Sequence, residues 1–415
     1  MNRNLLFLSG PGLVAGFLFL LAGCTKDEPP VVWDPNDPGA GTPSIRAVNP
    51  ASALGGITRV TVSGRNFSRV DTNNVVYFGV EMGTVVSATD TALVVIPPDL
   101  DNGGYTITVV VAGAYESAKF GPYTVEHAGI EYGGFGDLDE CYSLAVDAAE
   151  IVYAQLKAAT GDTARVFTIP PTPPYTSKTL YGTLKDGLSR PWPKASDMRM
   201  GPGGYLYLQQ TNNPNVYRIA PGGGVTVLYT VLPGRATAIE FDQNGNFFAG
   251  GDRAGVSVVK PDGSKRIVGT YSTMTIKALK VFNGDLYLAA ASPGATPGVW
   301  KSAILNADGD LGTSVQVLSW SQAPGTFPAS AVLSLAIAAD GTIYVGSDNA
   351  DPILMIPPGG TPSALYPGVL RPPATQLIWG TGQYLYCNRD HAVGANRRVI
   401  RIAMGKNGAP DYGRQ

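Results

Sequence analysis

Residues Ala238–Gly263 read AIEFDQNGNFFAGGDRAGVSVVKPDG, and their pattern indicates the fold of the larger part of the chain. Three short runs, AIEF, NFFA and VSVV, are separated by segments rich in Gly, Asp and Asn. Such runs have the length of β-strands, and the residues between them favour tight turns. The stretch therefore predicts consecutive strands joined by hairpins.

The same pattern recurs six times in the second half of the chain. The paired strands read SLAVDAAEIVYA, DMRMGPGGYLYL, AIEFDQNGNFFA, ALKVFNGDLYLA, SLAIAADGTIYV and QLIWGTGQYLYC. Each pair carries an aromatic residue at one fixed place: Tyr153, Tyr207, Phe248, Tyr287, Tyr344 and Tyr386. These aromatics are 54, 41, 39, 57 and 42 residues apart, close to the ~40 to 50 residues of a propeller blade. Each unit continues into a third strand and a further turn, so residues 130–412 are expected to form a six-bladed β-propeller, with a seventh, degenerate blade left open.

The repeats resemble those of NHL-repeat propellers, and residues 238–263 carry the resemblance most clearly. No helical pattern of ten or more residues separates the strands, which argues against a TIM barrel or a doubly wound sheet.

Residues 43–126 contain a second set of short strands. Strand-like runs separated by turn residues occur at Ser44–Val48, Arg59–Ser63, Val75–Phe78, Leu93–Ile96 and Tyr105–Val111. The motifs VTVSGRNF (60–67) and LVVIPP (93–98) resemble the IPT/TIG family of immunoglobulin-like domains. The resemblance implies a small β-sandwich that acts mainly as a spacer. The expected fold class is therefore all-β, with an Ig-like sandwich followed by a six-bladed propeller.

Composition excludes several classes of function. The 415 residues include 52 Gly and 33 Pro, and only 15% are charged. The 30 Lys and Arg nearly balance the 32 Asp and Glu, and no basic stripe indicates a nucleic-acid partner. Two His and three Cys lack the spacing of metal ligands, so neither a metal nor a cofactor is expected.

The first residues have the pattern of a secretory signal. An apolar stretch too short to span a membrane ends in Leu21-Ala22-Gly23-Cys24, which resembles the lipobox of bacterial lipoproteins. The resemblance implies cleavage after residue 23 and lipidation of Cys24, so that outer-membrane lipid is an expected partner. Lys26, Asp27 and Glu28 resemble the surface-export signal of Bacteroidota lipoproteins, and proline-rich residues 24–42 are expected to form a linker. The expected location is the outer membrane, facing the exterior.

The loops that follow the second strand of each unit are expected to meet at one mouth of the propeller. They supply a polar rim, rich in amides, that suits a neutral, hydroxyl-rich ligand. The candidate ligand-binding residues are Gln209, Asn212, Asp252, Arg253, Asp348, Asn349, Asn388, Arg389, Asp390 and His391, together with Trp192.

Function is predicted from this rim and from the anchor. The leading hypothesis is a non-enzymatic surface lipoprotein whose propeller binds an extracellular glycan, which is what a resemblance to surface glycan-binding lipoproteins of Bacteroidota implies. No catalytic residue is assigned. One alternative is an envelope lyase or lactonase that uses Asp390 and His391. The other is a scaffold for adhesion or for an outer-membrane protein partner.

Cys141 and Cys387 are the two cysteines outside the signal. Cys141 precedes the first strand of the first unit and Cys387 ends the second strand of the sixth, so both approach one face of neighbouring blades. A disulfide that closes the ring is predicted, and two separate buried thiols are the alternative.

Overall fold

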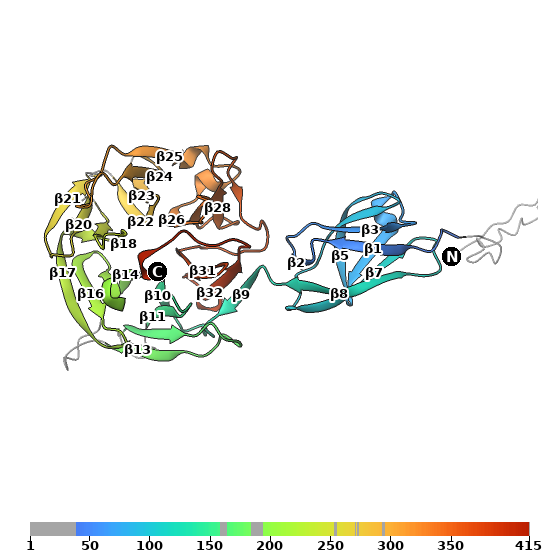
Figure 1. Cartoon of the computed structure of the whole chain (residues 1–415), viewed down its shortest axis with the longest axis horizontal. Coiled ribbons are helices and arrows are strands. Elements are labelled where there is room, and N and C mark those ends of the chain that lie inside the picture. The colour runs from blue at the N-terminus through green and yellow to red at the C-terminus, as the bar shows by residue number, and fades with distance from the viewer. Residues whose placement is uncertain are drawn as a thin grey trace, which may run out of the picture.

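The computed structural model describes residues 39–157, 164–183, 194–252, 255–269, 271, 274–292 and 295–414. Two all-β domains lie next to each other, a sandwich and a ring of blades, and the described C-terminal residues reach the centre of the ring (Figure 1). The predicted fold class is confirmed.

The sandwich contains eight strands in two sheets that share β5 (Glu81–Ala88). Their order is β1-β3-β6-β5-β4-β7-β8-β2. Inward residues at every second position, such as Val60 and Val62, are fully buried, as the alternation of a half-buried strand requires. The other strands are β1 (Ser44–Asn49), β2 (Ser52–Leu54), β3 (Val60–Arg65), β4 (Asn74–Phe78), β6 (Ala92–Ile96), β7 (Gly103–Val111) and β8 (Ala118–Glu126).

The VTVSGRNF motif ends β3 in a way that explains its residue types. A Cβ at Gly64 would lie 1.9 Å from the carbonyl oxygen of Ser44, so only glycine lets β3 approach β1 here. Asn66 adopts a left-handed conformation (φ 60°), and its side-chain nitrogen donates to the carbonyl oxygen of Thr42 at 2.8 Å. Phe67 then turns back into the core.

Six blades form the ring, so the predicted number is confirmed. Blades three, four and five are separate four-stranded sheets, while blades one and two are joined at their outer edges by a short parallel contact between β13 and β17. The strands are β10 (Cys141–Val146), β11 (Val152–Lys157), β12 (Ala164–Ile169) and β13 (Thr179–Thr183) in blade one; β14 (Ala195–Met200), β15 (Leu206–Gln210), β16 (Asn213–Ile219) and β17 (Gly224–Ala236) in blade two; β18 (Ala238–Phe241), β19 (Phe247–Gly250), β20 (Val256–Val259) and β21 (Lys265–Gly269) in blade three. They continue with β22 (Thr275–Phe282), β23 (Asp285–Ser292), β24 (Ala295–Ala303) and β25 (Val315–Ser319) in blade four; β26 (Val332–Ile337), β27 (Ile343–Ser347), β28 (Ile353–Ile356) and β29 (Ser363–Ala364) in blade five; and β30 (Gln376–Trp379), β31 (Tyr384–Arg389) and β32 (Arg398–Ala403) in blade six.

Blade six takes its fourth strand from the start of the domain. β9 (Gly129–Tyr132) pairs antiparallel with β32, so the ring is closed by two segments about 270 residues apart. Only His127 and Ala128 separate β9 from the last sandwich strand, β8. The same segment therefore closes the propeller and joins it to the sandwich.

The aligned aromatics explain why the blades stack. Tyr386 packs against blade one, Tyr153 against blade two and Tyr207 against blade three, each within one cluster of buried residues. Phe248 and Tyr344 repeat this contact with blades four and six. The repeated aromatic is thus the apolar contact between one blade and the next.

The predicted disulfide is not formed, and the alternation of β31 gives the reason. Cys141 and Cys387 are both buried free thiols. Tyr386 faces blade one and Cys141, so its neighbour Cys387 points to the opposite side, into the cluster shared with blade five. Burial raises the pKa of both thiols, that of Cys387 to about 12. The alternative of two separate buried thiols is the one the structure contains.

Candidate functional site

Two ends of the central channel have to be distinguished. At the hairpin mouth, the first strand of each blade turns into the second. At the crossover mouth, the second strand leads into the third, and the chain enters the next blade. The rim predicted from the sequence belongs to the crossover mouth.

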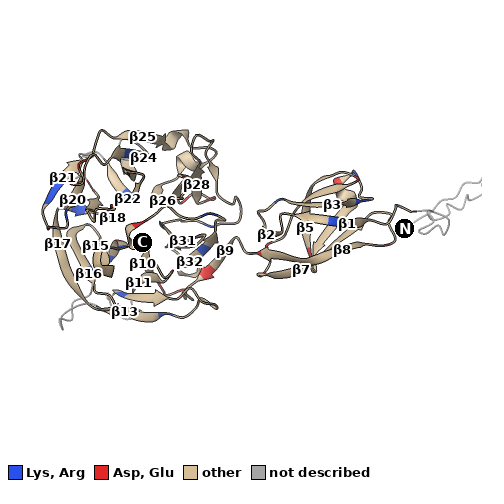
Figure 2. Ribbon diagram, in the orientation of Figure 1, with Lys and Arg blue, Asp and Glu red and all other residues tan. Residues whose placement is uncertain are grey.

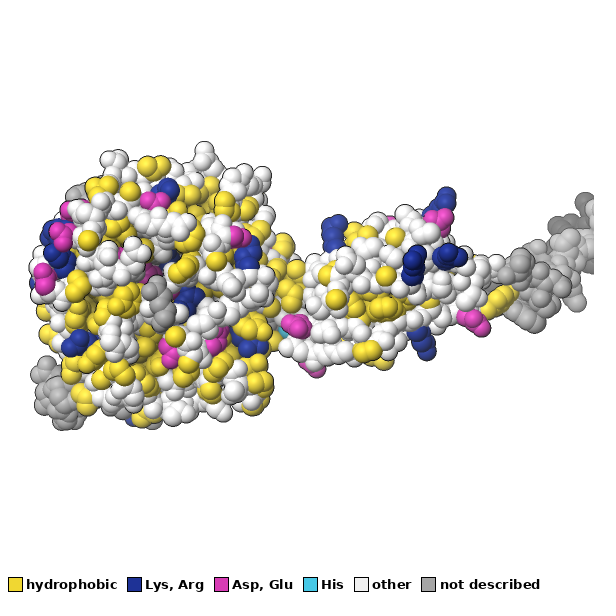
Figure 3. Space-filling view, viewed as in Figure 1, with side chains coloured by type: hydrophobic (Ala, Val, Ile, Leu, Met, Phe, Trp, Pro, Cys, Tyr) yellow, Lys and Arg dark blue, Asp and Glu magenta, His cyan; other side chains and the backbone are white. Residues whose placement is uncertain are grey.

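Charged residues are sparse along the chain, and both signs are spread over both domains (Figures 2 and 3).

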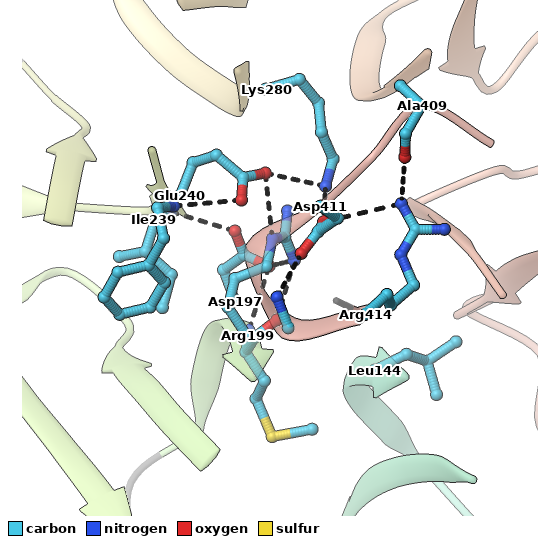
Figure 4. Close-up of polar contacts among 12 residues, drawn as sticks. Leu144, Asp197, Arg199, Ile239, Glu240, Lys280, Ala409, Asp411 and Arg414 are labelled. Atoms are coloured by element: carbon cyan, nitrogen blue, oxygen red, sulfur yellow. Dashed lines mark hydrogen bonds and ion pairs between the residues drawn. The ribbon is translucent and has the colours of Figure 1, made fainter. Parts of the chain in front are cut away.

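Three consecutive innermost strands carry a charged residue at the same place, opposite the aligned aromatic. Arg199 pairs with Tyr207 across the hairpin, Glu240 with Phe248, and Lys280 with Tyr287. These positions lie on the innermost strands, which surround the channel, and all three residues are buried. Figure 4 shows that their side chains converge.

The three residues belong to one chain of ion pairs, the channel network. Lys280 Nζ lies 2.7 Å from Glu240 Oε2 and 3.2 Å from Asp411 Oδ2. Arg199 contacts Asp197 at 2.6 Å and Glu240 at 3.4 Å. Arg414 approaches Asp411 at 3.9 Å. Three cations therefore face three carboxylates.

Gln376 carries the network across the channel. Its Nε2 donates to Asp197 Oδ1 at 2.9 Å, which links blade six to blade two. Its Oε1 accepts from the backbone nitrogen of Leu144 in blade one at 2.6 Å. The second oxygen of Asp197 accepts from the backbone nitrogen of Ile239 in blade three at 3.0 Å. One carboxylate thus connects three blades.

Burial and charge act in opposite directions on these acids. Burial raises the pKa of Asp197 and of Glu240, although nearby cations oppose it. For Asp411 burial also acts upward, but Lys280, Arg414 and Arg199 outweigh it and hold the pKa of this carboxyl well below its ordinary value. Charges taken out of water are tolerated only when each has a partner. The channel network is therefore a unit, because removal of one charge leaves the remaining buried charges without a partner.

The C-terminal segment, residues 408–414, closes the hairpin mouth. Ala409 donates its backbone N–H to the carbonyl oxygen of Ile337 at 2.9 Å, and Gly408 forms a bridge with Ala338. Arg414 donates to the carbonyl oxygens of Gly380 and of Ala409, both at 2.6 Å. These contacts bring Asp411 to the channel network.

A cavity of about 390 Å³ lies at the hairpin mouth, and we call it the channel pocket. Glu240, Lys280 and Asp411 are among the residues that line it. Its walls combine amides with aromatic rings: Gln243, Asn244, Asn283 and Asn306, and Phe241, Phe282, Trp379 and Tyr412. Phe282 and Tyr412 are half-buried, whereas Gln243, Asn244 and Asn283 are exposed at turns. The pocket therefore offers both hydrogen-bonding groups and apolar ring surface.

At the crossover mouth, charged side chains form ion pairs with one another around Asp390 and Glu140. Asp390 lies 3.7 Å from Lys194 and 3.6 Å from Arg397, and Arg397 also approaches Glu140 at 3.9 Å. Lys157 contacts the same Glu140 at 3.9 Å. Burial raises the pKa of Asp390, and Lys194 and Arg397 oppose that shift. These side chains form ion pairs between blades one, two and six.

Three of the predicted amides are structural. Gln209 and Asn388 are buried to 0% and 1% exposure. Gln209 donates to the carbonyl oxygens of Gln210 and Asn213, and Asn388 to that of Cys141 in blade one. Asn349 is also buried and donates to the Thr326 hydroxyl at 2.9 Å. Gln209 and Asn388 lie near the ends of β15 and β31, whose alternation points them at protein, and Asn349 lies in the bend after β27.

Of the other described candidates, Arg389 ends β31 and His391 follows in the same connection to β32, while Asn212, Asp252 and Asp348 lie in other loops. Asp348 is exposed and accepts from the backbone nitrogen of Ala331, Asn212 is exposed at a turn with φ 53°, and Asp252 is half-buried beside Thr275. Arg389 donates to the carbonyl oxygen of Asn396, and Nδ1 of His391 accepts from the backbone nitrogen of Val393 at 2.9 Å. Among the described residues, no side-chain contact between His391 and its neighbour Asp390 is recorded.

Several predicted residues lie outside the part of the chain that the structure describes. They are Trp192, Arg253, Cys24, Lys26, Asp27 and Glu28. Within the described residues, no group of three or more His, Cys, Asp or Glu could hold a metal ion. In the same residues, no helix is long and apolar enough to cross a membrane.

The channel pocket is not predicted from the sequence. Its turn residues, such as Asn283 and Asn244, have the pattern of ordinary hairpin turns. A usable signal was present, since Arg199, Glu240 and Lys280 occupy one place in three consecutive repeats where apolar residues would be expected. No local pattern indicated that Asp411 and Arg414 return to the channel.

The fold is that of an Ig-like domain joined to a six-bladed propeller, and comparisons agree with it. Residues 43–126 match the IPT/TIG domain family. No curated protein matches the chain in sequence.

Solved structures similar to this chain include an auxiliary nutrient binding protein from Bacteroides thetaiotaomicron VPI-5482, with a TM-score of 0.51 and 14% identity over 89% of this chain and 98% of that one. A putative phosphatase from the same organism has a TM-score of 0.50 and 12% identity over 88% and 98% of the two chains. A luciferin-regenerating enzyme has a TM-score of 0.51 and 13% identity over 68% and 98%. At these identities the likeness shows the fold alone.

Proposed function

We propose that the protein is a non-catalytic, lipid-anchored protein of the outer membrane whose propeller binds a neutral, hydroxyl-rich ligand in the channel pocket. An extracellular glycan fits this description best. The sandwich serves as a spacer between the membrane and the propeller, and the lipid on Cys24 serves as the anchor.

The observation that carries the proposal is the composition of the channel pocket. Amide side chains both donate and accept hydrogen bonds, which matches the hydroxyl groups of sugars. Half-buried rings such as Phe282 and Tyr412 can cover the apolar faces of a sugar ring. The volume of about 390 Å³ lies within the ~300 to 1,000 Å³ of ligand pockets.

A binding role is also supported by the similar fold of the auxiliary nutrient binding protein, which covers almost the full length of both chains. That protein comes from a Bacteroides species, the group to which the Lys26-Asp27-Glu28 resemblance points. Surface exposure is therefore part of the proposal.

Glycan arrays and calorimetry on the soluble chain from residue 25 onward test the binding role. Plant, algal and host glycans are screened, and a hit is titrated against the wild type, Phe282→Ala and Asn244→Ala. Tyr115→Ala, an exposed aromatic of the sandwich, is the matched control. Absence of binding across all glycan classes contradicts the proposal.

The anchor has a separate test. Labelling with a radioactive fatty acid is expected for the wild type and not for Cys24→Ala. Replacement of Lys26, Asp27 and Glu28 by alanine is expected to remove the protein from protease-accessible sites on intact cells while lipidation persists. Unchanged labelling of Cys24→Ala contradicts the lipid anchor.

A catalytic role at the crossover mouth is the second candidate. The observation in its favour is Asp390, a half-buried carboxyl whose pKa burial raises and which lies near Lys194. Such a group can serve as a general acid or base. Turnover of lactone and uronide substrates that is lost in Asp390→Asn and in His391→Ala would establish this role, and turnover that survives both variants would remove it.

A further inference from the structure

A second cavity lies on the outer side of blade six, where the propeller meets the sandwich. Its volume is about 340 Å³. Strands β9, β28, β31 and β32 and the segment 369–371 before β30 form its walls, and Asp99 of the sandwich reaches its edge. We call it the junction groove. It belongs to neither mouth of the channel.

Apolar side chains form one side of the junction groove. Val369 and Ile400 are half-buried and face the groove together with Leu370, while Ile353 and Ile402 lie beneath them with 0% and 1% exposure. Gly129 helps to keep the groove open, because a Cβ there would lie 3.2 Å from Ile400 Cγ2 and 3.5 Å from Leu370 Cδ2. This wall suits a short apolar body.

Two arginines, Arg371 and Arg389, line the same groove. Arg389 uses its Nε to donate to the carbonyl oxygen of Asn396 at 2.7 Å. Among the described residues, neither arginine has a carboxylate within ion-pair distance. Burial lowers the pKa of Arg389, and the nearby carboxylate of Glu131 opposes that shift without forming an ion pair with this arginine.

The two acids of the junction groove already contact other side chains, Arg398 and His127. Glu131 lies 3.0 Å from Arg398, and Asp99 lies 2.7 Å from His127. In the described chain, the two arginines of the groove are therefore left without a direct carboxylate partner beside an apolar wall. A half-buried guanidinium without an anion is unfavourable, and a planar carboxylate is the partner whose two oxygens match its N–H groups.

We propose that the junction groove binds a small organic carboxylate, with the carboxylate at Arg371 and Arg389 and a short apolar body against Val369, Leu370 and Ile400. This site is independent of the glycan site proposed for the channel pocket. The apolar wall favours a carboxylate over inorganic phosphate, and the arginines favour it over a neutral molecule of the same length.

Titration of the soluble two-domain chain with hexanoate, followed by NMR or calorimetry, tests the proposal. Hexanoate is expected to bind in a saturable way, while hexanol and inorganic phosphate bind at least ~10-fold more weakly. Arg389→Gln and Arg371→Gln are each expected to weaken hexanoate by ~10-fold or more. Arg69→Gln, which removes an exposed arginine of the sandwich paired with Asp90, is expected to change nothing.

The results that overturn the proposal are specific. Hexanoate that does not saturate, or that binds Arg389→Gln and Arg371→Gln as well as the wild type, contradicts it. Equal affinity for phosphate contradicts the role of the apolar wall. Val369→Ser trims that wall at a half-buried position and is expected to weaken hexanoate without affecting phosphate. Glycan binding is expected to be unchanged in all these variants, so failure here is distinguishable from failure of the channel pocket.

Discussion

The hairpin mouth and the crossover mouth of the propeller differ in what their polar side chains contact. At the crossover mouth, buried Gln209 and Asn388 hold backbone groups, and Asp390 pairs with Lys194 and Arg397. At the hairpin mouth, exposed Asn244 and Asn283 border a cavity. Residue types alone predict that the crossover mouth is the binding face, although its polar groups mostly connect one blade to the next.

The difference follows from strand geometry. A side chain at the end of a second strand still obeys the strand's alternation, so successive side chains point at one or the other of the two neighbouring blades. Side chains at the tip of a tight hairpin are released from that constraint and project outward. Polar residues are therefore better candidates for binding at hairpin tips of this ring than at strand ends.

The largest expected effect comes from breaking the channel network. Lys280→Met leaves Glu240 and Asp411 without their closest cation and is expected to lower the free energy of unfolding by about 3–5 kcal/mol. Lys406→Met, which removes an exposed pair with Asp340, is expected to lower it by less than about 1 kcal/mol. Tryptophan fluorescence during urea unfolding reports the propeller, because residues 43–126 contain no Trp. Equal effects of the two variants would show that the network does not act as a unit.

A smaller effect is expected from one hydrogen bond between blades six and one. The Tyr386 hydroxyl donates to Glu150 Oε1 at 3.0 Å, so Tyr386→Phe is expected to lower the free energy of unfolding by about 1.5–3 kcal/mol. The aligned Tyr344 has no recorded hydroxyl contact in the described chain, so Tyr344→Phe is the control and is expected to have little effect. The same urea experiment compares them. Equal losses would show that the bond to Glu150 does not stabilise the fold beyond what the Tyr344 hydroxyl contributes.

A still smaller effect is expected at the crossover mouth. Lys194 and Asp390 are partly exposed, with 44% and 22% of their side chains accessible, and their nearest atoms lie 3.7 Å apart. Lys194→Met is therefore expected to lower the free energy of unfolding by less than about 1 kcal/mol. A loss as large as that of Lys280→Met would remove the distinction between the two mouths.

The smallest effect is expected at the junction between the domains, at His127. Burial lowers the pKa of His127, but the carboxylates of Asp99 and Asp101 raise it by more, so the pKa lies above its ordinary value of 6.5. Because the pKa of His127 is higher in the folded than in the unfolded chain, protonation of His127 stabilises the fold. This contribution is fully present below pH 6.5 and is lost as the pH rises through the folded pKa. NMR titration is expected to show a lower pKa for His127 in Asp99→Asn, with His391→Gln used to assign the two histidines. An unchanged pKa would contradict the contact with Asp99.

Sequence periodicity was sufficient for the blades because the aligned aromatics, such as Tyr153 and Tyr386, repeat a contact that every blade needs. It could not reveal that β9 closes blade six, since that pairing joins distant segments. The disulfide prediction for Cys387 is wrong because closeness to Cys141 in the ring does not show to which side of the blade the Cys387 side chain points. The channel pocket depends on Asp411 returning to the centre, which no local pattern encodes.

The most direct test of the account is where a glycan binds. Calorimetry with a ligand found by array is expected to show about tenfold weaker binding for Phe282→Ala at the hairpin mouth, and a change below about twofold for Asp390→Asn at the crossover mouth. Tryptophan fluorescence confirms that both variants are folded. Binding that is retained by Phe282→Ala and lost in Asp390→Asn would contradict the assignment of the ligand to the channel pocket.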